Sequence, residues 1–329
     1  MFQLKIFVAE SFQNHSKIEL ISGVVGLFQE PINDKLFKEV KTIEQSDLVL
    51  VPHDAFYFSK YPEYLKYLNE LSIRKTIVFS DRGDFPKKPK ITNSIALRVA
   101  LNPGESAIRK IVIPYNVENL GYLPMRKYAS SPIISFMGYM PRISPKRIIQ
   151  AVRQSPIHPI KGNGAIIRAL SHRAFKQSNL DYHFVIRKSY GALSSSDSST
   201  ESNRKEYLDF LASSDMVLSP RGDANQSARF YETLSSGRIP LLPETSIFFP
   251  PIFGGSSIKN EFFLNFTQCA PKLDNLISRF WNNLDNNKYI YLQKEIRNIY
   301  NENFNFQTFI KNVFALDLVD FLNLAGVKH

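Results

Sequence analysis

The sequence predicts an α/β protein built from two doubly wound domains that face each other across a cleft. Apolar runs of strand length alternate with amphipathic helical segments twice along the 329 residues, a length that suits two ordinary domains. Residues 116–132 contain proline and glycine but few long apolar runs, and so separate the two alternations. We therefore predict domains at 1–120 and 130–300, with a C-terminal helix near 307–325 packing back on the first.

The first half contains short, continuously apolar runs, which are typical of strands buried on both faces of a parallel sheet. Pro52 and Pro114 are expected to close two of them. Helical spacing of apolar residues, such as Leu36, Val40 and Ile43, predicts the helices between them. The predicted strands are 5–9, 47–51, 76–79, 95–99 and 110–113, and the predicted helices are 35–45 and 61–72.

The second half repeats this alternation. Residues 189–202, which are rich in Ser, Gly and Asp, are expected to form an exposed, mobile loop. Ligands of such sheets bind beyond the carboxyl ends of the strands, so the loops at those ends are the candidate sites. The predicted strands are 133–137, 182–186, 216–218 and 239–242, and the predicted helices are 145–152, 206–214, 228–235, 273–300 and 307–324.

The strand-loop-helix-strand segment 216–242 is the strongest candidate for an anion site. Gly222 is expected to allow a positive φ or a close backbone approach in the turn Ser-Pro-Arg-Gly. Ser227 is placed to cap the following helix. The free N–H groups at that helix start, with Arg221 nearby, suit a diphosphate.

Arg229 and Glu232 lie three residues apart and therefore share one face of this helix. A carboxylate there can accept hydrogen bonds from ribose hydroxyls, and the arginine can meet charge that develops on a leaving group. Either feature alone is ordinary, since surface ion pairs and turns are common. Their conjunction at the end of one strand favours a functional site.

Other basic residues fit the same purpose. Arg187 follows the strand 182–186 and is expected to meet the diphosphate. Lys161 and Arg168 flank a Gly-Asn-Gly turn, which is a weaker phosphate signal.

The net charge of +11 favours anionic partners, but no nucleic-acid-binding signature accompanies it, so no specific nucleic acid is expected. The single cysteine, Cys269, excludes an internal disulfide and a cysteine-based zinc site, and the histidines lack metal-ligand spacing. No segment reads as a signal peptide or membrane span. A soluble, cytoplasmic protein without a metal site is therefore expected.

The segment 219–240 resembles the signature of the exostosin-like glycosyltransferases, in which a Pro-x-Gly turn, a Ser, an Arg and a Glu precede Gly-x-Ile-Pro. Three further segments are similar to elements of that family: 46–52, 109–114, and 134–138 with Arg142. The matching signature positions are Pro220, Gly222, Ser227, Arg229, Glu232, Gly237, Ile239 and Pro240.

The resemblance implies a glycosyltransferase-B fold, inversion at the anomeric carbon, no required cofactor or metal, and a donor held by the second domain. UDP-sugars are the family's usual donors, so a UDP-sugar is the expected one. Glu232 takes the ribose in this picture, and Arg229, Ser227 and Gly138 take the diphosphate.

The expected acceptor is a glycan or a lipid- or protein-linked saccharide. The family's animal members carry a signal-anchor and lumenal cysteines that are missing here, so a bacterial or viral member fits better. The positive charge suggests peripheral contact with an anionic membrane.

Inverting transfer needs a base near the acceptor hydroxyl, and the first domain should supply it. Asp81 ranks first, because it follows the strand 76–79 and resembles the family's His-Asp-x-Gly element. Asp54 and His53 rank second, and Asp84 third; each could equally be a solvated loop residue or a helix cap.

Two other function classes compete with the enzyme. One is a basic α/β module that docks on nucleic acid or anionic lipid, and the other is a catalytically inactive, transferase-like partner subunit. Glu232 argues against the first, because a binder driven by charge alone has no need of a carboxylate in its anion site.

Overall fold

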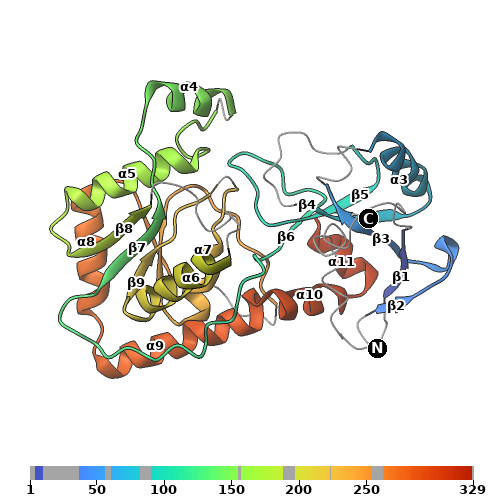
Figure 1. Cartoon of the computed structure of the whole chain (residues 1–329). Coiled ribbons are helices and arrows are strands. Elements are labelled where there is room, and N and C mark those ends of the chain that lie inside the picture. Colours follow the sequence, from blue (N-terminus) through green and yellow to red (C-terminus); the bar gives the residue numbers. More distant parts are fainter. Residues whose placement is uncertain are drawn as a thin grey trace. The chain divides into compact units, whose positions relative to one another are not determined.

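The computed structural model describes residues 4–9, 37–55, 61–81, 90–154, 157–187, 197–222, 224–253 and 262–327. The chain divides into two compact units, each with its own parallel sheet (Figure 1). The predicted class, two Rossmann-like α/β sheets, is confirmed. Unit 1 comprises Met1–Pro114, Phe248–Phe253 and Phe306–His329, and unit 2 comprises Tyr115–Ile247 and Gly254–Asn305.

The sheet of unit 1 has the strand order β2-β1-β3-β4-β5-β6 in the described residues, and every neighbouring pair is parallel. β1 lies between β2 and β3, so the direction in which the chain builds the sheet changes between β1 and β3. The strands are β1 Leu4–Val8, β2 Phe37–Glu39, β3 Leu48–Asp54, β4 Thr76–Asp81, β5 Ser94–Arg98 and β6 Lys110–Val112.

Helices cover both faces of this sheet because successive strand residues point to opposite sides. Leu48 and Leu50 pack in one core with α10 (Phe306–Phe314) and α11 (Leu318–Leu324). Val49 and Val51 pack in the other core with Tyr64, Leu68 and Leu71 of α3 (Pro62–Arg74). The C-terminal helices therefore belong to the core of the first sheet.

Three predictions in unit 1 need correction. Residues 37–45 form strand β2 and the 3₁₀ turn Ile43–Gln45, not a helix, because Phe37–Glu39 pairs in parallel with β1; positions 35 and 36 lie outside the described residues. β3 continues through Pro52 to Asp54, with a register shift against β4 between Leu50 and Asp54. β4 continues through Ser80 to Asp81.

The sheet of unit 2 has the order β11-β10-β9-β7-β8 over the part that the structure describes, again all parallel. From β7 the chain moves outward to β8, then returns to β9 on the other side of β7 and continues to β10 and β11. The strands are β7 Ile134–Tyr139, β8 Tyr182–Arg187, β9 Met216–Leu218, β10 Ile239–Pro243 and β11 Leu264–Phe266.

Helices also cover both faces of this sheet. His183 of β8 contacts Phe210 of α6, with ring centroids 5.5 Å apart, and the next residue, Phe184, contacts Phe175 of α5 at 5.0 Å. In Figure 1 the strands β7, β8 and β9 lie between α5 and α8 on one side and α6 and α7 on the other. The helices are α4 Pro145–Gln154, α5 Gly164–Lys176, α6 Asp197–Ala212, α7 Ala228–Ser235, α8 Ala270–Asn282 and α9 Asn286–Ile299, the last followed by a π turn at Tyr300–Phe304.

Three helix predictions differ from the structure. The predicted helix 273–300 is two helices, because Asp285 caps α9 by accepting a hydrogen bond from the Lys288 N–H at 2.9 Å. The predicted helix 307–324 is likewise two, since Asp317 caps α11. Within the predicted loop 189–202, positions up to 196 lie outside the described residues, and α6 already begins at Asp197.

Among the described residues no helix is both long and apolar enough to cross a membrane.

Candidate functional site

The sheet order of unit 2 locates a ligand site. In an open α/β sheet, a crevice forms at the carboxyl ends of two adjacent strands when the connections that follow them run in opposite directions. In this sheet those two strands are β7 and β9. The loop after β7 starts at Met140, and the loop after β9 is the segment 219–227 that the sequence singled out.

At this point Arg229 of α7 lies against Gly138 of β7. A Cβ atom built on Gly138 would lie 2.7 Å from Nη1 and 2.9 Å from Cζ of Arg229, so only glycine allows the guanidinium to sit there. The Arg229 Cζ also lies 5.0 Å from the ring centroid of Phe136, two residues earlier on β7. The structure thus brings together two residues that the resemblance placed on the diphosphate side.

Two further arginines stand near Arg229. Arg187 ends β8 directly beside Tyr139 of β7, and Arg168 of α5 donates to the Tyr139 carbonyl at 3.2 Å. Burial lowers the pKa of Arg229, and the positive charges of Arg168 and Arg187 lower it further. The carboxyl end of β7 is therefore a concentrated positive site.

Arg229 is only partly exposed. Among the described residues, no carboxylate lies within ion-pair distance of its guanidinium. Arg187, in contrast, pairs with Glu206 at 2.7 Å. An enclosed arginine without a carboxylate partner, beside two other arginines, is suited to bind an anionic ligand.

Glu232, one turn further along α7, has both carboxylate oxygens engaged. Oε1 accepts from Arg204 and Oε2 from the Tyr207 hydroxyl, both at 2.8 Å. Burial raises the pKa of Tyr207 well above its ordinary value, and the Glu232 charge raises it further, so the phenol keeps its proton and donates. A carboxylate offers about four acceptor positions, so Glu232 retains acceptor capacity for a ligand hydroxyl.

The sequence predictions missed Arg204 and Tyr207 as members of this site. Arg204 lay before the expected helix start at residue 206, and no local pattern joined Tyr207 to Glu232. Ser198 and Glu201, spaced as in a capping box, could have indicated the earlier start.

The loop after β9 is held by close backbone packing. A Cβ on Gly164 would clash with the Gly222 carbonyl and would lie 2.9 Å from the Arg221 oxygen. The described backbone has no positive φ at Gly222, and a Cβ there would meet nothing nearer than Arg168 at 3.8 Å. The close approach predicted for Gly222 therefore requires glycine at position 164 instead.

Pro220 and Arg221, at the start of this loop, are buried. Arg221 is almost fully buried and donates to the Lys161 carbonyl at 2.8 Å. The carbonyl of Arg221 in turn accepts from Arg168 Nε at 3.2 Å. Lys161, the other basic residue flanking the Gly-Asn-Gly turn, pairs with Glu244 at 2.8 Å. Arg221 and Arg168 thus tie the loop after β9 to α5.

α7 starts and ends where the sequence predicts. Ser227 is its N-cap residue with extended backbone, but its side chain makes no capping hydrogen bond. Gly237 ends it with a φ of +73°, and the Arg238 N–H bonds the Thr233 carbonyl at 2.9 Å, which completes a Schellman motif. Phe230, Tyr231 and Leu234 bury the opposite face of α7, which leaves Arg229 and Glu232 on the accessible face.

Arg142 lies in the loop after β7 and is exposed. It forms no ion pair within the described part of the chain.

In unit 1, Asp54 and His53 lie at the end of β3, beside the change of direction between β1 and β3. Both are buried. Asp54 accepts a hydrogen bond from the Ser80 hydroxyl at 3.2 Å, and the His53 ring meets the Tyr64 ring edge-on with centroids 5.5 Å apart.

Asp81 at the end of β4 is held in a buried ion pair. It faces Arg98 in the register of β4 and β5, and its Oδ2 lies 3.1 Å from Arg98 Nε. Arg98 also pairs with Glu105. Asp84 lies outside the described residues. Where the structure describes the chain, no group of three His, Cys, Asp or Glu residues is placed to hold a metal ion.

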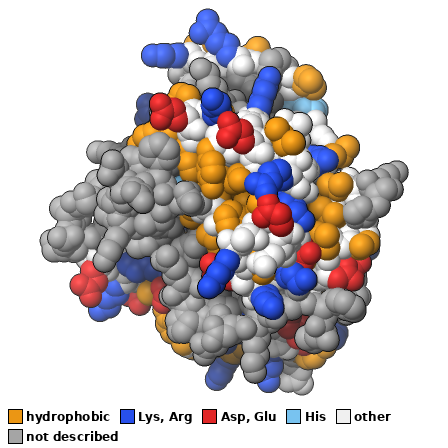
Figure 2. Space-filling model, turned by 90° about the vertical axis from the view of Figure 1, so that its right-hand side faces the viewer, with side chains coloured by type: hydrophobic (Ala, Val, Ile, Leu, Met, Phe, Trp, Pro, Cys, Tyr) orange, Lys and Arg blue, Asp and Glu red, His pale blue; other side chains and the backbone are white. Residues whose placement is uncertain are grey.

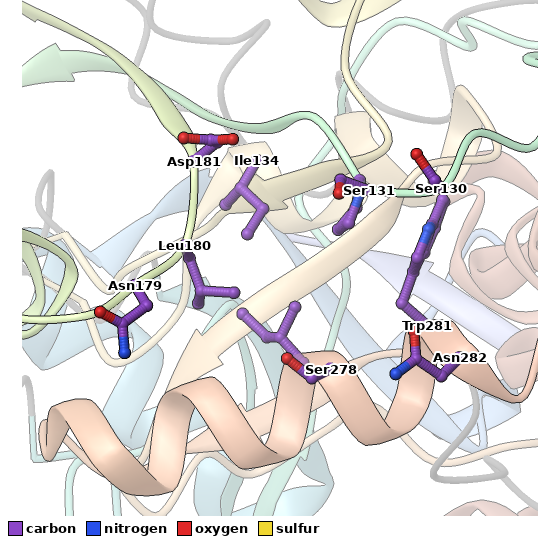
Figure 3. A pocket seen from close by; sticks show the side chains of 11 residues that line it. Ser130, Ser131, Ile134, Asn179, Leu180, Asp181, Ser278, Trp281 and Asn282 are labelled. Atoms are coloured by element: carbon purple, nitrogen blue, oxygen red, sulfur yellow. The ribbon is translucent and has the colours of Figure 1, made fainter.

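A small pocket of about 180 Å³ lies at the opposite end of the second sheet (Figure 3). Ile134, at the start of β7, lines it together with Asp181 just before β8 and with Ser278 and Trp281 of α8. This amino-terminal edge of the strands is not where open α/β sheets bind ligands. The pocket is therefore separate from the candidate site.

Fold and site together define an α/β protein with two parallel sheets and an arginine-rich site at the carboxyl edge of the second. A protein-family model, the RXYLT1 C-terminal domain, matches residues 167–249, about a quarter of the chain. The matched segment runs from α5 through β10 and contains Arg168, Arg229 and Glu232. The match supports a glycosyltransferase. No curated protein matches the sequence significantly.

Three solved structures show distant similarity. TarM is 13% identical over 79% of this chain and 57% of its own, with a TM-score of 0.37. The catalytic domain of starch synthase IV from Arabidopsis thaliana, bound to ADP and acarbose, is 13% identical over 86% and 56%, with a TM-score of 0.30. The spinosyn forosaminyltransferase SpnP is 11% identical over 83% and 77%, with a TM-score of 0.29. The chain spans a little over half the length of the first two.

Proposed function

We propose that this protein is an inverting glycosyltransferase that moves a sugar from a nucleotide-diphosphate sugar, a UDP-sugar, to a hydroxyl of a glycan or of a lipid- or protein-linked saccharide. The observation that carries the proposal is the Arg229 guanidinium, which is held against Gly138 at the change of direction in the second sheet without a carboxylate partner among the described residues.

The donor diphosphate is assigned to Arg229 and to the backbone N–H groups that begin α7. Ser227 makes no side-chain cap, so its hydroxyl does not compete with an anion for these groups. The ribose is assigned to the remaining acceptor positions of Glu232. Arg204 and Tyr207 hold that carboxylate in place, which limits the ordering cost when the donor binds.

The general base is assigned to unit 1, and we prefer Asp54 to Asp81. The carboxylate of Asp81 is engaged in a buried ion pair with Arg98, which gives Asp81 a structural role. Asp54 lies at the direction change of its own sheet, where open α/β sheets bind ligands, and accepts a hydrogen bond from the Ser80 hydroxyl at 3.2 Å. His53 beside it is the second choice.

In the proposed step, the base takes the proton of the acceptor hydroxyl while that oxygen bonds to the anomeric carbon from the face opposite the leaving group. The bond between the anomeric carbon and the diphosphate breaks, and the nucleoside diphosphate leaves with the electron pair. Arg229 and the neighbouring arginines meet the charge that develops on it, so we expect transfer without an added cofactor and in the presence of a chelator.

We also propose a bacterial or viral source and a cytoplasmic location; the single cysteine is compatible with a reducing compartment. We further propose that the protein contacts an anionic membrane peripherally.

A direct assay tests the function. Purified protein is incubated with a panel of UDP-sugars, with and without saccharide acceptors, and released UDP is measured. We expect UDP release that depends on one donor and rises with acceptor, with inverted configuration in the product. If the protein binds nucleotide diphosphates but releases none with any donor, the inactive-subunit alternative holds instead.

A further inference from the structure

The helix α4 presents an apolar face to solvent. Ile148, Ile149 and Val152 lie on one side of it, at spacings of one, three and four residues, and each is close to half exposed, at 48%, 55% and 46%. Among the α4 residues whose burial is described, Ala151 is the one that is buried. The apolar face of this amphipathic helix therefore points away from the core of unit 2, the reverse of the usual arrangement.

The segments on either side of α4 extend this feature. Ile143 before the helix is 42% exposed, and Ile157 and Ile160 after it are more exposed still. In Figure 1, α4 stands apart from the other helices of unit 2. Figure 2 shows basic and apolar side chains together at the upper end of the molecule, which is the end where α4 lies in Figure 1.

The charge of this region is entirely positive. Residues 142–161 contain five basic residues and no acidic one. Lys161 is bound to Glu244, and Arg147 donates to the Tyr139 hydroxyl at 3.1 Å. The other three, Arg142, Lys146 and Arg153, are exposed and form no ion pair within the described ranges.

We propose that this α4 surface, formed by Ile143, Ile148, Ile149 and Val152 with Arg142, Lys146 and Arg153, docks on a bilayer that contains anionic lipid. A basic helix with an exposed apolar face lies in the membrane interface, with its apolar side chains among the acyl chains and its cations at the headgroups.

The apolar and charged parts together favour a bilayer over other anionic partners. Nucleic acid would satisfy the cations but would leave three aliphatic side chains in water. A second copy of the chain would cover the aliphatic side chains but would bring two acid-free, positive segments together. Anionic lipid satisfies both.

Vesicle flotation of the full chain tests the proposal without reference to transferase activity. Vesicles of phosphatidylcholine alone are compared with vesicles of phosphatidylcholine mixed with phosphatidylglycerol. We expect binding to the second and not to the first, and a loss of binding as salt is raised.

Two variants separate the charge from the apolar face. Lys146→Glu/Arg153→Glu is expected to weaken binding to anionic vesicles about tenfold or more. Its matched control is Lys272→Glu/Arg279→Glu on α8, which has the same seven-residue spacing, the same charge change and exposed side chains. Ile149→Ser is expected to weaken binding roughly threefold to tenfold. Its control is Ile73→Ser on α3, an isoleucine that is 85% exposed in unit 1.

Retained melting temperatures show that the variants fold. The proposal is overturned if binding ignores phosphatidylglycerol, or if the control variants lose as much binding as the α4 variants. It is equally overturned if the protein binds single-stranded nucleic acid but no vesicle, or if Ile149→Ser instead converts a dimer in solution to a monomer.

Discussion

The guanidinium of Arg229 packs on the backbone of Gly138 so closely that any side chain at position 138 would displace it. Gly138 belongs to β7 and Arg229 to α7, the helix that follows β9. The contact therefore lies where the second sheet changes direction, between β7 and β9. The proposed donor site depends on this arrangement.

Gly138→Ala is therefore expected to reduce affinity for a nucleoside diphosphate at least about tenfold, because the added methyl group pushes the guanidinium away. The overpacking should also cost about 1–3 kcal/mol of unfolding free energy. Calorimetric titration and urea unfolding measure the two effects. Unchanged affinity in a folded variant would show that the Arg229–Gly138 contact does not contribute to nucleotide binding.

Gly164, which begins α5, and Gly222 in the loop after β9 are expected to respond differently to replacement by alanine. Gly164→Ala drives a methyl group into the Gly222 carbonyl, so we expect a loss of about 2 kcal/mol or more in stability and a weaker nucleotide site. Gly222→Ala adds a methyl group in ordinary contact and is expected to change stability by less than about 1 kcal/mol. Equal effects of the two substitutions would contradict this description of the loop.

The sequence allowed the two sheets and the α7 segment to be predicted because both depend on local signals. Buried parallel strands are continuously apolar, and Ser227, Arg229, Glu232 and Gly237 lie within one helix and its caps. Arg204 and Tyr207 of α6 become partners of Glu232 on α7 only through contacts between two helices that are separate in sequence. The ion pair between Asp81 and Arg98 depends on the register of β4 against β5, which no local sequence pattern specifies.

Asparagine substitutions at Asp54 and Asp81 are expected to affect different properties, turnover in the first case and stability in the second. Asp54→Asn is expected to lower turnover about 10²–10⁴-fold with nucleotide affinity unchanged, because only the proton acceptor is lost. Asp81→Asn removes one carboxylate from buried Arg98 and should cost about 3 kcal/mol of stability.

Turnover numbers and chemical unfolding of the same two proteins provide the comparison. An Asp54→Asn enzyme with full turnover, beside a stable but inactive Asp81→Asn enzyme, would return the base to Asp81.

His172 on α5 predicts a pH dependence of stability. Burial lowers the pKa of His172 below its ordinary value of 6.5, and nearby Lys176 lowers it further. The unfolded chain therefore binds a proton at this histidine at higher pH than the folded chain does, so stability should fall as pH drops below about 6.5. Replacing it with Phe should flatten that part of the profile in urea unfolding between neutral pH and pH about 5. A profile identical to that of the unchanged protein would show that His172 does not contribute.

The most direct test of the donor site is calorimetric titration of UDP into the unchanged protein, Arg229→Ala and Arg173→Ala. Arg173 is an exposed arginine on α5 and serves as the matched control. We expect the unchanged protein and Arg173→Ala to bind UDP, and Arg229→Ala to lose at least about a hundredfold in affinity, as expected for a charge-assisted diphosphate contact. Equal affinity of all three proteins for UDP, or no binding of any nucleoside diphosphate by the unchanged protein, would contradict the proposed donor site.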